Sequence, residues 1–424
     1  MVSTPHPAHK PGASLGTVRL VQSYPTNRWA NFHMEGVLYR RMLERGCPQG
    51  SQLGPTLWKV AISPITVIST DSSKILTYAD DILLMVGAAR PKTAFTRIEK
   101  KLDKFIEWAT EYALEFSAGK TQLLSPKGGL KPGYSIAFGT AADAPRIESS
   151  PTAKYLGVVL DPRRSYWDHV LAICKKSDDM YSRLRALYSA NWGMGQSAAS
   201  IIYKGVFLPR VAYAAEIWAE GSKLRKSRVK QLSAQRKPLL AITGAYKTSS
   251  TNCLAAVAGT LPLDLEIRHQ AALRDLAREK ISNDEMDTIT DELVNELQER
   301  YTSTNKGSWT QKMIPSVRQR YHLPLVLDHY TTQFLTGHGD FKAKLHSLAL
   351  IDYPICACDR KPETVNHVLR FCPRTAAARL KLKRIMREEG EAWPPANGAF
   401  LKSRRTFSAL KSFAREALTN RDDR

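Results

Sequence analysis

Residues 75–86 run Ile-Leu-Thr-Tyr-Ala-Asp-Asp-Ile-Leu-Leu-Met-Val, with two apolar segments on either side of two adjacent aspartates. Short apolar segments around a tight polar pair predict a β-hairpin, with Asp80 and Asp81 at its turn. Two neighbouring carboxylates repel each other unless a cation lies beside them. Phosphoryl-transfer sites use such carboxylates to hold a pair of Mg²⁺ ions. The alternative is an ordinary solvent-exposed Asp-Asp turn.

Two loops flank this hairpin along the chain. Upstream, Gly46-Cys-Pro-Gln-Gly-Ser-Gln-Leu-Gly-Pro55 has three glycines, which allow a ligand to approach the backbone closely, while Gln49 and Ser51 offer hydrogen bonds. Downstream, Gly119-Lys120-Thr121 places a lysine in a predicted turn between two strands over 116–124, where its ammonium could meet a phosphate. The alternatives are a plain Gly/Pro loop and a solvated turn lysine.

The periodicity of apolar residues changes along the chain. Apolar residues at 95, 98, 102, 105, 109 and 112 predict an amphipathic helix, and residues 17–45 are expected to be partly helical. A strand is predicted over Lys154–Leu160. Beyond residue 162 helical patterns dominate, near 170–188, 196–219, 224–242 and 264–280. The pattern predicts an α+β fold, with a mixed region followed by a helical one.

Charge favours nucleic acid as the partner. The 424 residues carry a formal net charge of +22, and residues 175–250 hold 14 Lys/Arg against 4 Asp/Glu. Clustered positive charge is typical of proteins that bind polyanions. No apolar run approaches the roughly 20 residues of a membrane span, and the first 16 residues lack the apolar core of a signal peptide. No membrane partner is therefore expected.

Four residues near the C-terminus have the spacing of metal ligands. Cys356, Cys358, His367 and Cys372 can supply three thiolates and one imidazole, a sufficient tetrahedral shell for one Zn²⁺. The first spacing is one residue, shorter than the common two to four. Basic neighbours at 360, 361, 370 and 374 suit a nucleic-acid-binding knuckle. The alternative is a small loop with unligated cysteines.

The helical region offers two further kinds of nucleic-acid contact. Arg225, Lys226, Arg228 and Lys230 can bind phosphates without regard to sequence, or form a solvated helix face. Aromatic residues among the basic ones are candidates for stacking on bases, although their helical spacing favours the core. These aromatic residues are Trp192, Tyr203, Tyr213 and Trp218.

The order and spacing of these motifs resemble the reverse transcriptase of non-LTR, LINE-type retrotransposons. Segments 208–213 and 258–265 and Trp218 extend the resemblance to insect elements that insert into ribosomal RNA genes. The resemblance implies that Asp80 and Asp81 hold two Mg²⁺ ions and that Lys120 protonates the leaving pyrophosphate. It places the template and nucleotide beside Gln49, Gly50, Ser51 and Tyr78. It assigns the grip on the primer end to Tyr155, Leu156 and Gly157, with Asp161 and His169 nearby.

The resemblance also implies a domain order. It comprises a disordered N-terminus (1–16), a partial polymerase palm (17–161), a helical thumb (162–265), a helical connector (266–350), a CCHC-type zinc knuckle (351–375) and a basic helical tail (376–424). The implied partners are the element RNA as template, target DNA in ribosomal RNA genes as primer, and deoxynucleoside triphosphates. The implied site of action is the nucleus, after translation in the cytoplasm.

One departure from the family pattern concerns the metal site. The family places a further metal-binding aspartate on a strand before the Pro-Gln-Gly loop, but the only acidic residues before Asp71 here are Glu35 and Glu44. We therefore expect Met1 to begin a fragment that joins the palm in mid-domain and is inactive alone. Two alternatives are a nucleic-acid-binding remnant without polymerase activity and the reading frame of a decayed element.

Overall fold

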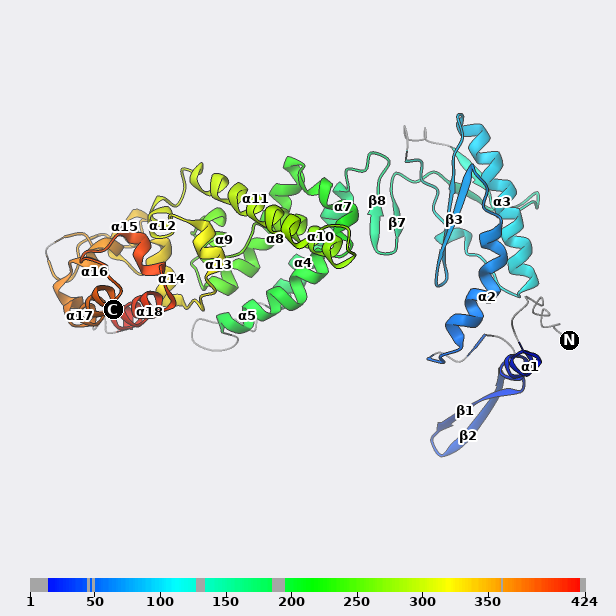
Figure 1. The fold of residues 1–424 in the computed structure, drawn as a ribbon, viewed down its shortest axis with the longest axis horizontal. Helices are drawn as coiled ribbons and strands as arrows, with labels where there is room; N and C mark the ends of the chain where they lie inside the picture. The colour runs from blue at the N-terminus through cyan, green and yellow to red at the C-terminus, as the bar shows by residue number, and fades with distance from the viewer. Residues whose placement is uncertain are drawn as a thin grey trace. The chain divides into compact units, whose positions relative to one another are not determined.

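The computed structural model describes residues 14–43, 46–47, 50–126, 134–184, 195–359 and 361–419. The chain forms two compact units, with the division between Pro151 and Thr152 (Figure 1). The sequence pattern places this division later, at residue 162. It falls earlier because the segment 153–160 packs on the first helix of the second unit, where the backbone N–H of Val159 donates to Nδ1 of His169 at 3.3 Å.

The first unit combines helices with small antiparallel sheets, each of two strands. Its longest helix confirms the amphipathic pattern predicted over 95–112, and the hairpin predicted over 75–86 is also present. The helices are α1 (Leu15–Ser23), α2 (Gly54–Val67) and α3 (Pro91–Glu111), with a 3-10 turn at Ala118–Lys120. The strands are β1 (Arg28–Met34), β2 (Val37–Leu43), β3 (Ser73–Tyr78), β4 (Asp81–Val86), β5 (Ser135–Ala137) and β6 (Arg146–Glu148).

The core of the first unit lies between α2, α3 and one face of the β3–β4 hairpin. Ile65 of α2, Ile75 of β3 and Phe105 of α3 are buried together in one apolar cluster. Ile75 pairs with Leu84 across the hairpin, so both point to this cluster because directly paired residues share a face. The hairpin is thereby fixed by packing on one face, and its turn extends beyond the core.

One further prediction for the first unit is confirmed, and another is wrong. Residues 17–45 are partly helical, as predicted, because α1 extends to Ser23, and the rest of that segment is mainly the β1–β2 hairpin, which has no buried residue. The strand pair predicted over 116–124 is absent from the described residues. Instead Thr121 donates from its backbone N–H and its hydroxyl to the carbonyl of Ser117, which closes a tight turn. Residue 123 makes only an isolated bridge to Ser149.

The second unit is mostly helical after one hairpin, as its sequence pattern predicts. Its strands are β7 (Ala153–Tyr155) and β8 (Val158–Leu160). Its longer helices are α4 (Trp167–Leu184), α8 (Arg225–Thr243), α10 (Leu263–Ala277), α11 (Asn283–Thr302), α17 (Ala376–Glu388) and α18 (Arg404–Thr419). Its shorter ones are α5 (Gln196–Ile202), α6 (Leu208–Val211), α7 (Ala215–Ser222), α9 (Thr251–Ala258), α12 (Ser308–Met313), α13 (Val317–His322), α14 (His329–Thr336), α15 (Lys342–Ser347) and α16 (Val365–Arg370). A π-helical turn at Tyr203–Phe207 joins α5 to α6, and 3-10 turns lie at Pro373–Thr375 and Asn397–Leu401.

The C-terminal segment is part of the core and not a peripheral tail. Helix α18 buries Phe407, Leu410 and Phe413 in one apolar cluster with Phe334 of α14 and Leu382 of α17. Their three- and four-residue spacing along α18 puts these side chains on one helix face, and its basic residues lie on the other. Residues 376–419 are largely helical, as predicted, and their apolar face is packed into the core of the second unit.

Candidate functional site

The two aspartates lie at the tip of the β3–β4 hairpin. Tyr78 pairs with Asp81, so Ala79 and Asp80 form a two-residue turn, and Asp81 is the first residue of β4. Ala79 has a φ of 50°, the left-handed conformation that tight hairpin turns require. Both carboxylates are exposed, and the side chain of Tyr78 is 64% exposed. The turn therefore presents two adjacent acidic groups to solvent.

Packing from α2 fixes the position of this turn. The indole N–H of Trp58 donates to the carbonyl of Ala79 at 2.6 Å. Neither Asp80 nor Asp81 has an ion pair with a described residue, so their charges are available to a bound cation. In the part of the chain that the structure describes, no third carboxylate joins them to form a three-ligand metal group.

The loop before α2 positions the start of that helix. Gln49 lies outside the described residues. Gly50 has a φ of 83°, which a side chain would strain. The hydroxyl of Ser51 accepts hydrogen bonds from the Tyr24 hydroxyl and from the backbone N–H of Leu53, the latter at 3.2 Å. In the described loop, Ser51 thus links α1 to the start of α2.

Lys120 ends the 3-10 turn after α3. Its side chain is exposed, and its backbone N–H donates to the carbonyl of Ser117 at 3.2 Å. It makes no hydrogen bond or ion pair with Asp80 or Asp81. The structure therefore places Lys120 in the same unit as the two aspartates but does not join it to them.

Tyr155, Leu156 and Gly157 form the tip of the β7–β8 hairpin in the second unit, where a single strand was predicted. Leu156 and Gly157 have φ values of 43° and 86°, so this pair turns the chain through two left-handed positions. The hydroxyl of Tyr213 donates to the carbonyl of Leu156 at 3.1 Å. A Cβ at Gly157 would lie 3.2 Å from the Tyr213 ring, so glycine suits this close approach.

Two nearby residues that the family resemblance singles out have structural roles. The Asp161 carboxylate accepts from the backbone N–H groups of Arg163, Ser165 and Tyr166 at 2.6–3.1 Å, which holds the loop before α4. His169 is 2% exposed and lies edge-on to the Trp218 ring. Both residues fix the packing of the β7–β8 hairpin on the helices.

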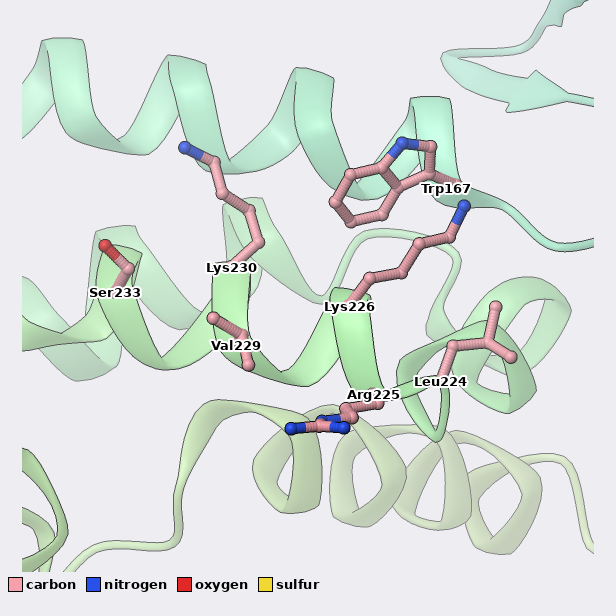
Figure 2. A pocket seen from close by; sticks show the side chains of 7 residues that line it. All are labelled: Trp167, Leu224, Arg225, Lys226, Val229, Lys230 and Ser233. Carbon is pink, nitrogen blue, oxygen red and sulfur yellow. The ribbon is translucent and has the colours of Figure 1, made fainter.

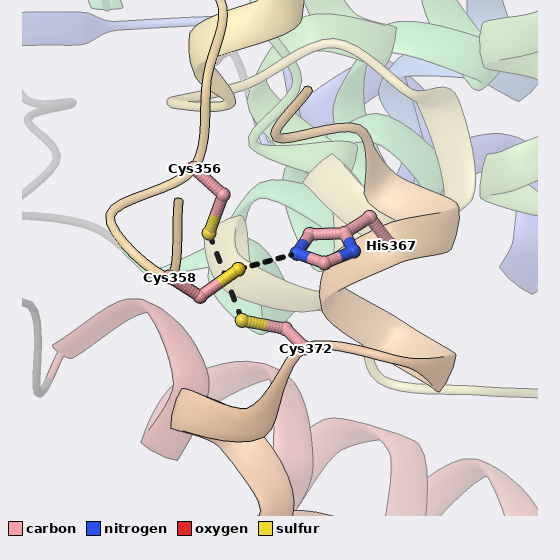
Figure 3. Close-up of side chains that lie close together, drawn as sticks. All are labelled: Cys356, Cys358, His367 and Cys372. Atoms are coloured by element: carbon pink, nitrogen blue, oxygen red, sulfur yellow. Dashed lines mark hydrogen bonds between the residues drawn. The ribbon is translucent and has the colours of Figure 1, made fainter. Parts of the chain in front are cut away.

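The three cysteines and the histidine near the C-terminus converge, as Figure 3 shows. One possible ligand atom from each residue lies within 4.8 Å of all the others. The Sγ atoms of Cys356 and Cys372 are 3.6 Å apart, and Cys358 Sγ is 3.2 Å from Nε2 of His367. A tetrahedral Zn²⁺ with the usual bond lengths of about 2.3 Å to sulfur and 2.0–2.1 Å to nitrogen needs separations close to these. The four residues therefore fit one zinc ion.

Local hydrogen bonds hold Cys356, His367 and Cys372 of this Cys/His cluster in place. The backbone N–H of Cys356 donates to the carbonyl of Lys361 at 3.0 Å, and that of Asp359 to the carbonyl of Cys356 at 2.8 Å, which closes the turn between the first two cysteines. Thr364 caps α16 by accepting from the backbone N–H of His367 at 3.1 Å. Arg360, one of the basic neighbours of the cluster in the sequence, lies outside the described residues.

Proton and metal binding compete at this cluster. Burial, together with the adjoining thiols of Cys372 and Cys358, raises the pKa of Cys356 to about 12 when no ion is present. Burial and then the charges of Arg379 and Lys361 lower the pKa of His367. The imidazole is thus neutral and able to ligate, while the Cys356 thiol needs a cation before it ionises.

The basic run lies on α8 beside a surface pocket of about 740 Å³ (Figure 2). Arg225 and Lys226 are exposed, and Arg228 and Lys230 are half-buried. In Figure 2, Lys226 and Lys230 extend from α8 toward α4, and the ammonium of Lys226 lies 4.6 Å from the centre of the Trp167 ring. The pocket combines positive charge with an aromatic surface, as binding sites for nucleic acids do.

The aromatic residues chosen from sequence are mostly core residues. Tyr203 and Trp218 are buried, Tyr213 is exposed but packs on the β7–β8 turn, and Trp192 lies outside the described residues. Trp167 was missed. Trp167 lies one turn before the apolar stripe of α4 and beside Asp168, and this position in the sequence does not indicate a binding role. Trp167 comes close to the basic run only because α8 packs on α4.

Comparisons with known proteins identify the family. Residues 13–160 match the family "Reverse transcriptase (RNA-dependent DNA polymerase)". A Pol polyprotein from an R1 type-1 retrotransposable element of Nasonia vitripennis is 31% identical over 287 residues, covering 64% of this chain and 72% of that protein. The chain belongs to the Pol polyproteins of R1-type retrotransposable elements. No solved structure matches it.

Some of the relatives are longer than this chain. The R1 Pol polyprotein of Bradysia coprophila is 29% identical over 359 residues, which cover 79% of this chain but 35% of that protein. An RNA-directed DNA polymerase from the mobile element jockey of Drosophila funebris is 26% identical over 213 residues, covering 48% of this chain and 22% of that protein. The chain thus spans about a third of the Bradysia polyprotein.

The family match covers the aspartate turn and both flanking loops. It runs through the first unit and ends at residue 160, after the β7–β8 hairpin. The Cys/His cluster and the basic run lie beyond the matched reverse transcriptase segment. Among the described residues, no helix is long and apolar enough to cross a membrane.

Proposed function

We propose that this chain supplies the RNA-directed DNA polymerase portion of an R1-type Pol protein. It extends the 3′ end of target DNA, in ribosomal RNA genes, on the element RNA with deoxynucleoside triphosphates as substrates. The observation that carries the proposal is the turn at Tyr78–Asp81, which presents two exposed carboxylates within the segment that matches reverse transcriptases. This DNA synthesis would take place in the nucleus, after translation of the protein in the cytoplasm.

The other candidate residues take roles around this turn. Asp80 and Asp81 are the acidic ligands, and Lys120 is the acid that protonates the leaving pyrophosphate. Gln49, Gly50, Ser51 and Tyr78 lie at the template and nucleotide. Tyr155, Leu156 and Gly157 grip the primer end, for which the rigid β7–β8 turn is suited because Tyr213 packs on it.

The described residues fit one part of a magnesium site. Mg²⁺ prefers carboxylate oxygens in octahedral geometry, and Asp80 and Asp81 offer two such groups without competing ion pairs. Two Mg²⁺ ions need a further carboxylate to bridge them, and the described residues bring none to this turn. The described residues alone do not fit a two-ion site, and we expect no primer extension by residues 1–424 alone.

A fusion tests the polymerase proposal. The upstream part of a longer R1 relative is joined to this chain, and extension of a DNA primer on an RNA template is measured with Mg²⁺. The fusion should synthesise DNA, and Asp80→Asn should abolish synthesis because the amide keeps the shape of the side chain but not its charge. The matched control is Asp71→Asn, an exposed aspartate in the turn before β3, which should leave the rate unchanged.

One outcome contradicts the polymerase proposal, and another contradicts the expected inactivity of the chain alone. Equal rates for the fusion and its Asp80→Asn variant would show that the turn does not hold the reacting metal. Extension by the unmodified 424-residue chain would show instead that Glu35 or Glu44 supplies the bridging carboxylate, since these are the only acidic residues before Asp71.

A nucleic-acid-binding remnant is the second candidate function. It is favoured by the complete basic pocket on α8, which does not depend on the aspartate turn. This candidate predicts that the fusion binds RNA and DNA but synthesises nothing with intact Asp80. The polymerase proposal predicts both binding and synthesis.

We propose that the Cys/His cluster holds one Zn²⁺ through Cys356, Cys358, His367 and Cys372. The observation that supports it is the mutual approach of all four ligand atoms. Zinc would supply local folding free energy and orient the basic residues around the cluster toward nucleic acid. No reaction step passes through this ion.

Metal analysis of the full chain tests the zinc site. The purified chain should contain one zinc per molecule, and Cys358→Ser should lose it because a serine hydroxyl stays protonated at neutral pH and is a poor zinc ligand. Cys174→Ser is the matched control, since Cys174 is a buried cysteine of α4 that is outside the cluster. Retention of full zinc by Cys358→Ser, or a folded wild-type chain without zinc, would refute the site.

A further inference from the structure

A second pocket in the second unit, about 580 Å³ in volume, has a polar lining without acidic groups. Among its lining residues are five with hydroxyl side chains, two permanently basic residues and one histidine, and there is no Asp or Glu. It is formed by segments that are far apart in sequence: α8, the loop and first turn of α9, the loop at 304–307, and His338. The pocket shares no lining residue with the candidate sites described above.

A fixed guanidinium lies on one side of the pocket. The Arg236 side chain donates to Thr251 Oγ1 at 2.5 Å and to the carbonyls of Lys247 and Ser249 at 2.5 and 2.9 Å. Among the described residues it has no carboxylate partner. Its charge is therefore held in one orientation by neutral oxygens and is not neutralised, which suits a bound anion.

The N-terminus of α9 contributes a second set of donors. Ser250 is the N-cap residue, but its side chain makes no capping hydrogen bond. The backbone N–H groups of Thr251 and Asn252 likewise make no hydrogen bond to another described residue. Uncapped N–H groups and the helix dipole give this end a partial positive charge, a common feature of phosphate sites.

A buried hydroxyl in the same pocket has no partner. Ser249 lines the pocket and is 2% exposed, and its Oγ atom makes no hydrogen bond in the described structure. Buried polar atoms are almost always hydrogen-bonded, so an orphaned hydroxyl in a polar cavity marks the place of a missing acceptor or donor. This observation is independent of the helix end.

The close packing of Gly307 against α9 brings Lys306 to the same pocket. Gly307 has a φ of 83°, and a Cβ there would lie 2.1 Å from Cys253 Sγ, so only glycine allows the 304–307 loop to lie against α9. The exposed Lys306 thereby lines the pocket. His338 is bonded through Nδ1 to Thr248 Oγ1 at 2.8 Å. Burial and then Lys344 lower its pKa, so it acts as a neutral hydrogen-bonding group.

We propose that this pocket binds a phosphate group, held by Arg236, Lys306, Ser249 and the N-terminus of α9. Phosphate fits because it has several acceptor oxygens that can meet donors from different directions, whereas a carboxylate has two. The phosphate comes either from a nucleic-acid backbone or from a free phosphate ion. A backbone phosphate would give the second unit a contact with the template or primer that is separate from the basic run on α8.

Thermal unfolding of the full chain tests the phosphate chemistry. Inorganic phosphate should raise the melting temperature above that in sodium chloride of equal ionic strength, because a ligand that binds only the folded state stabilises it. Lys306→Glu should abolish this difference, and Ser249→Ala should reduce it. Ser249→Ala removes a hydroxyl that has no partner, so it should not lower the melting temperature in chloride.

Lys175→Glu is the matched control, since Lys175 is exposed on α4 and has no ion pair with a described residue. It makes the same change in charge as Lys306→Glu and should keep the phosphate-specific stabilisation. No phosphate-specific rise in the wild-type chain would overturn the proposal. An undiminished rise in both Lys306→Glu and Ser249→Ala would also overturn it.

Binding of single-stranded DNA and RNA at several salt concentrations distinguishes the two sources of phosphate. If the pocket holds a backbone phosphate, Lys306→Glu should weaken binding. It should also reduce the magnitude of the slope of log affinity against log salt concentration by roughly 0.7, which corresponds to the loss of one phosphate contact. If it holds free phosphate, Lys306→Glu should lose phosphate stabilisation while nucleic-acid affinity stays equal to that of Lys175→Glu.

Discussion

Acid should weaken the second unit through one buried histidine. His169 lies at the contact between α4 and the β7–β8 hairpin, where Nδ1 accepts from the Val159 backbone N–H at 3.3 Å. The ring centroid is 4.9 Å from that of Trp218, in an edge-on arrangement, and Nε2 is buried without a partner. Because Nδ1 accepts a hydrogen bond, a second proton on this ring would break that bond and leave a buried charge.

The size of the effect follows from the pKa of this residue. Burial, and secondarily the positive charge of Lys176, lowers the pKa of His169 from 6.5 to about 4. The folded chain therefore binds the proton more weakly than the unfolded chain. Its stability contribution is fully present above pH 6.5 and is lost as the pH falls toward 4. At about 1.4 kcal/mol per pH unit, the loss approaches roughly 3 kcal/mol.

The assay compares urea unfolding of the wild-type chain and His169→Gln at pH 7, 6, 5 and 4, followed by far-ultraviolet circular dichroism. Glutamine can accept the Val159 hydrogen bond through its side-chain oxygen but does not titrate. The wild-type chain should lose about 3 kcal/mol more than the variant between pH 6.5 and 4, since all other titrating groups are common to both. Parallel pH profiles for the two proteins would refute the assignment of this acid sensitivity to His169.

Two further predictions concern the second unit. Replacing Arg225, Lys226, Arg228 and Lys230 together with Ala should weaken RNA and DNA binding and reduce the salt slope by up to about 3–4, whereas an unchanged slope would make the run a solvated helix face. Phe413→Ala should destabilise the chain by roughly 3–5 kcal/mol in urea unfolding, because Phe413 is 2% exposed within the α14–α17–α18 cluster, while a loss below 1 kcal/mol would show that α18 is not part of that core.

Local sequence patterns predict the hairpin of the aspartates because every contact that defines it is short in range. Ile75 and Leu84 alternate with outward residues, and Tyr78 pairs with Asp81 across a two-residue turn. The prediction of one strand over 154–160 was wrong because Gly157 allows a turn in the middle of this segment. Gly157, with Leu156 in the left-handed region, turns three residues of strand back on three others, although the apolar content alone suited one continuous strand.

The burial of one face of α18 is visible in the periodicity of the sequence, although the charge of residues 376–419 indicated only a basic helical tail. Phe407, Leu410 and Phe413 recur at three residues and are followed by Ala414 and Ala417, a spacing that predicts a buried helix face. The phosphate pocket had no comparable signal. Arg236 reaches Ser249 and Lys306 only through tertiary packing, so neither spacing nor composition could bring the three together.

The integration of the Cys/His cluster into the C-terminal core changes what zinc would do there. Arg379 of α17 is 5% exposed and donates to the carbonyls of Val368, Leu369 and Cys372 at 2.7–3.1 Å. These bonds satisfy the last carbonyls of α16, the helix that carries His367, and hold the segment of Cys372. Val368 and Leu369 lie in the same apolar cluster as Phe413 of α18. An ion bound by the four ligands would therefore stabilise α16, α17 and α18 as one body, which a knuckle on a free tail could not do.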